Sequence, residues 1–213
     1  MPRPTARLFW VGLVLTGALL VLAGLLAALN MRDGKPLPVY GQVSDFVLTN
    51  HDGKAFFLSD LQGKVWVADI IFTRCPGPCL KMTRQMRELQ KALPASSQAK
   101  LVTLTTDPVF DTPAVLKAYA QRFGADFSRW LFLTGTKKQI ARLAIDSLKL
   151  TALEKKPEER QSEDDLFVHS TIFVAVDKRG QLRGIFETTG EGIDPAQVRG
   201  EIVAAVNRLE RER

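Results

Sequence analysis

The feature that most limits how this chain can fold is an uncharged apolar run near its start. Residues 8–29, LFWVGLVLTGALLVLAGLLAAL, contain no charged side chain. At about 1.5 Å of helical rise per residue, a run of this length crosses the hydrocarbon core of a bilayer. It cannot belong to the core of a soluble domain. We therefore expect one transmembrane helix over residues 8–29, followed by a single globular domain.

A cleaved secretory signal is the alternative to a retained anchor. Signal peptides have apolar cores of about 7 to 15 residues, which is shorter than this run. No cleavage pattern with small residues is evident near Ala27 and Ala28, and no cysteine is present there to accept a lipid. We therefore expect an anchor. Arg3 and Arg7 favour a cytoplasmic arm over residues 1–7 and a domain on the outer or periplasmic face of the cytoplasmic membrane.

The net charge of +6 does not indicate nucleic-acid binding. Residues 1–35 carry four basic side chains and one acidic side chain, a net of +3, which leaves +3 for the other 178 residues. A basic surface with interleaved aromatic residues, the usual signature of a nucleic-acid interface, is not evident. We expect membrane and protein partners and no nucleic acid.

The order of strand-like and helix-like runs predicts the class of fold. Residues 30–42 are rich in proline and glycine and are expected to form a linker. The domain is expected over residues 43–213 as an α/β, thioredoxin-like fold, with a mixed central sheet flanked by helices. The charged stretch 154–165 is expected to be a solvated loop. The expected strands are 43–48 and 54–61 as a hairpin, 65–72, 101–106, 130–135, 170–176 and 182–187, with helices after Cys79, Pro113, Thr136 and Pro195.

The candidate functional site centres on the two cysteines of the chain. Cys75 and Cys79 lie where a buried strand run meets a helix run. Pro78 suits the first turn of a helix, so we expect the positive end of that helix to face the sulfurs and to favour thiolates. Thiolates bind soft metals or attack disulfides.

Several kinds of chemistry compete for this cysteine pair. A structural disulfide over so short a loop contributes only about 2 kcal/mol. Structural zinc takes four protein ligands, and the chain has two cysteines and two histidines in all. Cu(I) is held by two thiolates and one imidazole. Dithiol reductases of the thioredoxin type have two residues between their cysteines, whereas this chain has three. The sequence therefore favours metal.

His169 is the better of the two candidate imidazole ligands. It precedes the expected strand 170–176, at a junction that lies beside the cysteine loop in a thioredoxin-like sheet. Thioredoxin-type reductases have a cis-proline at this junction, and no proline is found near His169. A lone histidine is more often a structural residue, so position alone leaves its role open. His51 is expected to be a turn residue of the hairpin.

Methionine thioethers also bind Cu(I), so Met82 and Met86 need an interpretation. They fall at helical spacing with Leu89 and Leu93 after the cysteines. This spacing predicts one apolar stripe that faces the core. We expect core residues, not ligands.

Four segments resemble, in order, the landmarks of the Sco/SenC family. They are FTRCPGPC (72–79), TDPVFDTPAVLKAYAQRFG (106–124), WLFLTG (130–135) and HSTIFVAVDKRGQL (169–182). The resemblance implies a copper-binding protein with a thioredoxin fold that helps to assemble the binuclear copper centre of cytochrome c oxidase. Cys75 and Cys79 match the cysteine pair of the family and His169 matches its histidine ligand. The implied cargo is Cu(I), with Cu(II) binding left open.

The sequence departs from the family at three positions around the site. Val168 stands where an acidic residue often precedes the histidine, Phe110 where a basic residue is frequent, and Leu80 where many members have proline. Asp107 is a candidate for orienting a site residue. Capping of the turn before Pro108 is an equally good interpretation of Asp107.

The function expected from these features is copper delivery. Copper would pass by ligand exchange to the copper-receiving subunit of cytochrome c oxidase or to another copper protein. A thiol:disulfide oxidoreductase, which keeps the partner's copper-ligand cysteines reduced, is the alternative from another class. A peroxidase-like member of the same fold is a third candidate.

Overall fold

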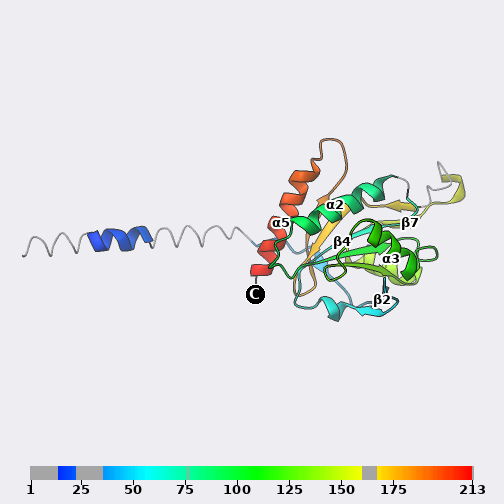
Figure 1. The fold of residues 1–213 in the computed structure, drawn as a ribbon, viewed down its shortest axis with the longest axis horizontal. Coiled ribbons are helices and arrows are strands. Elements are labelled where there is room, and N and C mark those ends of the chain that lie inside the picture. The colour runs from blue at the N-terminus through cyan, green and yellow to red at the C-terminus, as the bar shows by residue number, and fades with distance from the viewer. Residues whose placement is uncertain (1–13, 23–35, 76, 160–166, 213) are drawn as a thin grey trace, which may run out of the picture. The chain divides into compact units, whose positions relative to one another are not determined.

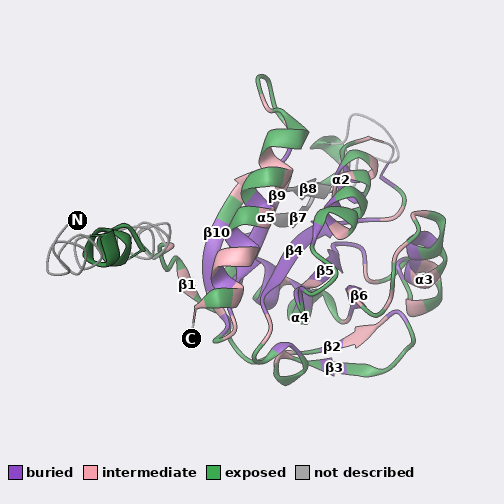
Figure 2. Ribbon diagram, turned by 60° about the vertical axis from the view of Figure 1, so that its left-hand side comes forward, coloured by how far each residue is buried: buried purple, intermediate pink, exposed green. Residues whose placement is uncertain are grey.

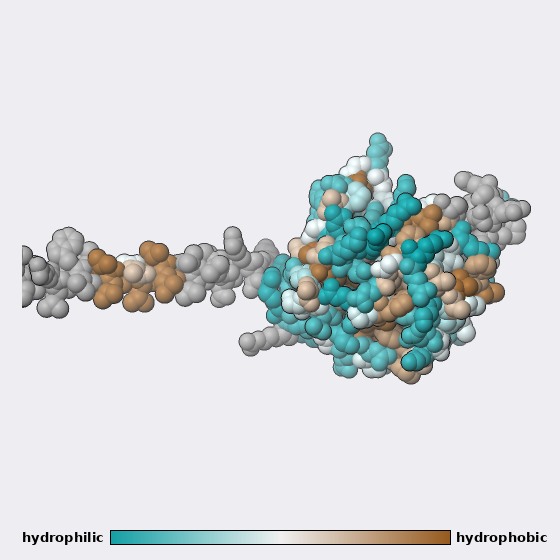
Figure 3. Space-filling view, in the orientation of Figure 1, coloured by the Kyte–Doolittle hydropathy of each residue, from teal (hydrophilic) through white to brown (hydrophobic). Residues whose placement is uncertain are grey.

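The computed structural model describes residues 14–22, 36–75, 77–159 and 167–212 (Figure 1). The chain forms two compact units, Met1–Pro36 and Leu37–Arg213. In the first unit residues 14–22 are helical, and Figure 3 shows them as an apolar segment. Within the described residues, no helix has the length and hydropathy needed to cross a membrane. The remainder of the expected anchor, residues 8–13 and 23–29, and the expected arm, residues 1–7, lie outside the described residues.

The second unit is built on an eight-stranded mixed sheet. Its order is β1-β10-β9-β4-β5-β6-β2-β3. The central strands β4, β5 and β6 are parallel, and the other pairings are antiparallel. The strands are β1 (Gly41–Gln42), β2 (Val47–Asn50), β3 (Ala55–Phe57), β4 (Trp66–Ile71), β5 (Lys100–Thr105), β6 (Trp130–Thr134), β9 (Ile172–Val176) and β10 (Gln181–Glu187).

Helices cover both faces of this sheet and bury two apolar cores. Helices α2 (Pro78–Ala92), α3 (Pro113–Arg122) and α5 (Pro195–Arg211) pack on one face, with Met82, Leu116 and Ile202 in a common core. Helix α4 (Lys137–Ala141), the π-helical turn η2 (Arg142–Ser147) and the 3-10 turn η1 (Leu58–Leu61) enclose the other core. Figure 2 shows the buried central strands between these layers. The expected mixed sheet flanked by helices is confirmed.

The charged stretch contains structure that its composition does not predict. β7 (Ala152–Glu154) and β8 (Phe167–His169) pair as a separate two-stranded antiparallel sheet, and Pro157–Glu159 forms the 3-10 turn η3. The expected loop 154–165 is therefore partly wrong, with residues 160–166 outside the described part. Strands of three residues are too short to show an alternating pattern. The expected strand 170–176 begins at Ile172.

The start of the second unit lies inside the stretch expected as a linker. Arg183 is only 3% exposed, and its guanidinium donates to the carbonyl oxygens of Leu37 at 2.8 Å and Pro38 at 3.1 Å. The Tyr40 N–H donates to the Leu182 carbonyl at 2.8 Å, next to the short strand β1. These contacts join residues 37–42 to the sheet.

Candidate metal centre

The two cysteines lie together at the carboxyl end of β4. β4 leads into a turn in which the Cys75 N–H donates to the Phe72 carbonyl at 3.2 Å. Pro78 opens α2, and Cys79 lies in its first turn. Both cysteines are buried, no disulfide joins them, and the Cys75 side chain hydrogen-bonds to that of Cys79. Two thiols are thus held side by side on a strand-to-helix turn.

Burial dominates the electrostatics of this pair. Loss of solvent raises the pKa of the Cys79 thiol above its usual range, and the neighbouring Cys75 adds to that shift. The expectation that the helix end would favour a thiolate is therefore wrong for Cys79. Desolvation outweighs the helix dipole at this position. A bound soft metal would replace the thiol proton, because a coordinating thiol is deprotonated.

His169 is the last residue of β8, and its backbone pairs with Ala152 of β7. Its side chain lies outside the described part of the structure. Among the described residues, no three His, Cys, Asp or Glu side chains are grouped as a metal site. The three-ligand set of Cys75, Cys79 and His169 therefore stays a prediction.

The backbone just after His169 is nevertheless tied to α2. Gln85 of α2 donates through Nε2 to the Thr188 carbonyl at 2.8 Å. Thr188 in turn donates to the Thr171 carbonyl, from its N–H at 3.0 Å and from Oγ1 at 2.6 Å. The chain at Thr171 is thus linked to the cysteine-bearing helix through Thr188.

Asp107 contacts the residue before Cys75 and not the cysteines. Its Oδ2 accepts from Arg74 Nη2 at 2.5 Å. Its Oδ1 accepts from the Phe110 N–H at 3.5 Å, and its carbonyl accepts from the Asp111 N–H at 2.8 Å. Asp107 therefore caps its own turn and also binds Arg74. Its role in orienting a site residue stays a prediction.

Asp111 is a positioning residue that the sequence reasoning missed. It is fully buried, and its carboxylate accepts from the Thr73 N–H at 3.1 Å, from the Thr73 hydroxyl, and from the Thr105 hydroxyl at 2.5 Å. Burial raises the pKa of this carboxyl. The N-cap of α3 is Thr112, whose Oγ1 accepts from the Val115 N–H at 3.4 Å. Asp111 follows β5, whose carboxyl end lies beside that of the parallel strand β4. This position after β5 was the sequence signal that could have placed Asp111 near the cysteine turn.

The other residues singled out from the sequence are structural. Met82 and Met86 are buried in the core under α2, as expected. His51 lies in the hairpin turn, as expected, but it is buried. Its ring stacks on Phe127 at 4.1 Å, and its Nδ1 accepts from the Phe132 N–H at 3.3 Å. The β2–β3 hairpin that carries His51 forms one edge of the sheet and is separated from β4 by β5 and β6.

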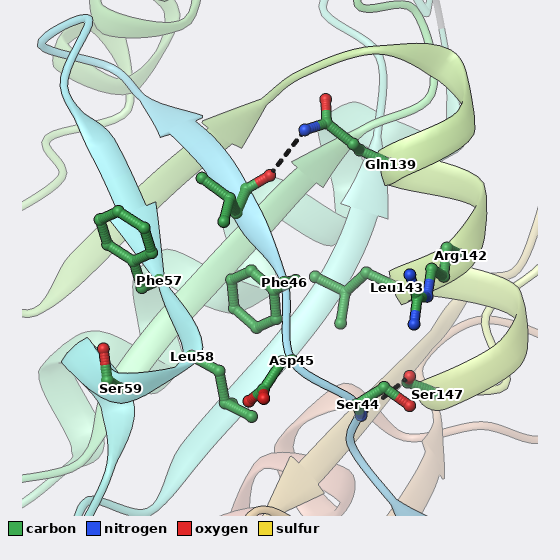
Figure 4. Close-up of a pocket in the computed structure, with 11 residues that line it drawn as sticks. Ser44, Asp45, Phe46, Phe57, Leu58, Ser59, Gln139, Arg142, Leu143 and Ser147 are labelled. Atoms are coloured by element: carbon green, nitrogen blue, oxygen red, sulfur yellow. Dashed lines mark hydrogen bonds between the residues drawn. The ribbon is translucent and has the colours of Figure 1, made fainter.

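A cavity of about 540 Å³ lies away from the cysteines, between the β2–β3 hairpin and α4 (Figure 4). Phe46, Leu58 and Leu143 point into it, and none of the candidate site residues lines it. This cavity therefore plays no part in the cysteine site.

Comparisons with known proteins agree with the fold. The SCO1/SenC family model matches residues 38–207. The SCO1 protein homolog of Bacillus subtilis (strain 168) is 37% identical over 147 residues, which cover 68% of this chain and 73% of that protein.

Two solved structures show the same fold. BsSco, a member of the Sco family of cytochrome c oxidase assembly proteins with an identified disulfide switch, is 28% identical, with a TM-score of 0.68 over 84% of this chain and 100% of BsSco. Copper-bound yeast Sco1 is 26% identical, with a TM-score of 0.64 over 78% of this chain and 89% of that chain. These matches confirm the expected thioredoxin-like architecture of the domain. The chain belongs to the SCO1/SenC family.

Proposed function

We propose that this protein carries copper on Cys75, Cys79 and His169 and delivers it for assembly of the copper centre of cytochrome c oxidase. The observation that carries the proposal is the pair of buried, adjacent thiols at the start of α2. Family membership supports it, because a related Sco protein is known with copper bound and another is described as an oxidase assembly protein.

The donor set suits Cu(I). Two soft thiolates and one imidazole satisfy a trigonal Cu(I) ion, whereas structural zinc takes four protein ligands. The thiols are enclosed by apolar side chains that include Phe72 and Met82, and this environment limits access of water. Of the two histidines in the chain, His51 is engaged in the hairpin turn. His169 is therefore the imidazole left to complete the site.

Delivery proceeds by exchange of ligands. The two thiols are held in the main domain by β4 and α2, whereas His169 is carried by the separate two-stranded β7–β8 sheet. His169 is therefore the ligand that leaves first, and an incoming thiolate or imidazole of the partner takes its place. The partner's further ligands then replace Cys75 and Cys79, which regain their protons.

Anaerobic titration of the reduced protein with Cu(I), in competition with a chelator, tests this site. We expect one tightly bound Cu(I) per chain, loss of tight binding in Cys75→Ser and in Cys79→Ser, and weaker binding in His169→Ala. Met82→Leu is the matched control, because it removes a buried thioether near the site at nearly constant volume and leaves the proposed ligands intact. A wild-type protein without a stoichiometric site would contradict the proposal.

The alternative function is reduction of a partner disulfide. The adjacent thiols that are not joined by a disulfide favour it, and BsSco has an identified disulfide switch. In that reaction Cys75 and Cys79 lose two electrons and two protons and form a disulfide, while the partner disulfide becomes two thiols. Turnover on a partner disulfide that is indifferent to His169→Ala would favour the reductase. Weaker Cu(I) binding in His169→Ala, with partner reduction intact, would show that both roles coexist.

Residues 8–29 anchor the protein in the cytoplasmic membrane in this proposal, with the domain on the outer or periplasmic face. The uncharged length of this run and the preceding Arg3 and Arg7 support the assignment. We expect the full chain to stay in the membrane fraction after an alkaline wash, and its domain to be digested by protease added outside the membrane. Release by the wash would contradict the anchor, and protection from the protease would contradict the orientation.

A further inference from the structure

Two neighbouring apolar side chains are exposed on the loop between β5 and α3. Val109 is 76% exposed and Phe110 is 43% exposed. Single exposed apolar residues are ordinary, but a consecutive pair at a loop tip presents a small contiguous apolar surface. The loop is held in one conformation, because the Phe110 and Asp111 N–H groups both donate to the Asp107 carbonyl, at 3.2 Å and 2.8 Å. This apolar surface is therefore preformed.

The loop that carries this pair is fastened to the cysteine turn. Arg74, the residue before Cys75, forms an ion pair with Asp107 at 2.5 Å, and its Cζ lies 4.2 Å from the centre of the Phe110 ring. One residue earlier, the Thr73 N–H and hydroxyl both donate to the buried Asp111 carboxylate. The exposed apolar pair thus belongs to a loop whose residues Asp107, Phe110 and Asp111 contact the two residues that precede Cys75.

The charged side chains next to the cysteines in the sequence are basic: Arg74 precedes Cys75, and Lys81 and Arg84 follow Cys79. Arg74 is partly exposed, and its charge is balanced by Asp107. Lys81 and Arg84 are exposed in the first two turns of α2, and neither has an ion-pair partner in the described part of the chain. A partner protein that docks here gains binding free energy from apolar contact with Val109 and Phe110 and from carboxylates placed around that contact.

We propose that Val109, Phe110 and Arg74 form the docking surface for the copper-receiving protein, a partner with an apolar contact flanked by acidic side chains next to its own copper ligands. This inference rests on the proposed function. Ligand exchange requires the partner's ligands to reach a copper ion held at Cys75, so the surface next to Cys75 falls within the area that the partner covers. Well-packed apolar anchors at such positions supply much of the binding energy of an interface.

Kinetics of Cu(I) transfer test the docking surface. Copper-loaded wild type and the double variant Val109→Ser, Phe110→Ser are mixed with the apo form of the copper-binding domain of cytochrome c oxidase from the same organism. We expect Cu(I) affinity to be unchanged in the variant. We expect the partner concentration at half-maximal transfer rate to rise by about tenfold, and the maximal rate at saturating partner to be retained.

The β2–β3 hairpin at the edge of the sheet offers a matched control. Val47 and Phe57 face each other across the β2–β3 hairpin and are similarly exposed, at 46% and 43%. The double variant Val47→Ser, Phe57→Ser should transfer copper as the wild type does.

The salt dependence of transfer tests the charges of the docking surface. Higher salt should raise the partner concentration at half-maximal transfer rate for the wild type, because exposed charges are screened.

The outcomes separate this inference from the proposed function. Wild-type transfer kinetics in the Val109→Ser, Phe110→Ser variant would overturn the docking surface while copper delivery stands. Transfer that is independent of salt would overturn the acidic character of the partner surface. A wild-type protein that binds no copper, or that never transfers it, would overturn the proposed function instead.

Discussion

Asp111 joins the cysteine turn to the next strand through one buried carboxylate. Replacement by alanine removes the acceptor for the Thr73 N–H, the Thr73 hydroxyl and the Thr105 hydroxyl. Buried donors left without a partner are costly, so we expect Asp111→Ala to lower the free energy of unfolding by about 2–4 kcal/mol. Denaturant unfolding measures this change. Asp45→Ala, at an exposed aspartate, is the control, and an equally small effect at both positions would contradict the role of Asp111.

His51 gives the stability of the domain a pH dependence. Burial against Phe127 lowers the pKa of His51 from its usual value of 6.5. The Asp52 carboxylate opposes this shift, and Lys117 on α3 adds to it. The folded state therefore favours the neutral imidazole. This contribution to stability is present above pH 6.5 and is lost as the pH falls from 6.5 toward the lowered pKa of the folded state.

Denaturant unfolding between pH 7.5 and pH 5.5 measures the effect of His51. We expect the free energy of unfolding of the wild type to fall on acidification, by at most about 1.4 kcal/mol per pH unit for one proton. His51→Gln keeps a side chain that can accept from the Phe132 N–H and has no charge to gain. It should show a smaller fall. Equal slopes in the two proteins would contradict the assignment to His51.

Helix α2 carries Cys79 and is also linked to the backbone after His169, because Gln85 donates to Thr188 and Thr188 donates to Thr171. Removal of a single hydrogen bond of this kind costs about 1 kcal/mol, or about fivefold in an equilibrium constant. We therefore expect Gln85→Ala to weaken Cu(I) binding by about fivefold and to leave the helical signal in circular dichroism unchanged. Gln90→Ala changes the same residue type on the same helix, where the contacts are to Gly124 and Asp126. Equal Cu(I) affinities in both variants would show that the link to Thr188 does not support the site.

Elements with a strong periodic pattern were predicted from the sequence nearly to the residue. Burial alone determines the apolar stripe of α2 and the apolar run of β4. The helical spacing of Met82, Met86 and Leu89 was therefore sufficient to predict α2. The short strands β1, β7 and β8 were not predicted. Each has two or three residues, and its pairing depends on partners such as Leu182 and Ala152 that are remote in sequence.

The whole domain is closed by contacts between its first and last residues. Arg183 donates to the carbonyl oxygens of Leu37 and Pro38 and pairs with Asp177 and Glu212. A soluble form that begins at Leu37 keeps these contacts, whereas one that begins at Val43 loses the two carbonyls and β1. We expect the shorter form to be less stable by about 2–4 kcal/mol, because it leaves a buried guanidinium partly unpaired. Equal thermal unfolding of the two forms would contradict this role of residues 37–42.

The candidate site was predictable in part. Spacing and residue type identified Cys75 and Cys79, and the strand-to-helix turn that joins them follows from β4 and Pro78. The raised pKa of Cys79 was not predictable, because it depends on how completely the folded domain excludes water from the thiol. The contact of Asp111 with Thr73 and that of Arg74 with Asp107 were also not predictable from the sequence, since both depend on the parallel pairing of β4 with β5.

X-ray absorption spectroscopy of the protein loaded with one Cu(I) per chain tests the central claim most directly. We predict a three-coordinate Cu(I) ion with two sulfur ligands and one imidazole nitrogen, and loss of the imidazole signal in His169→Ala with both sulfurs retained. Copper bound without the two sulfurs, or an imidazole signal unchanged by His169→Ala, would contradict a copper site built from Cys75, Cys79 and His169.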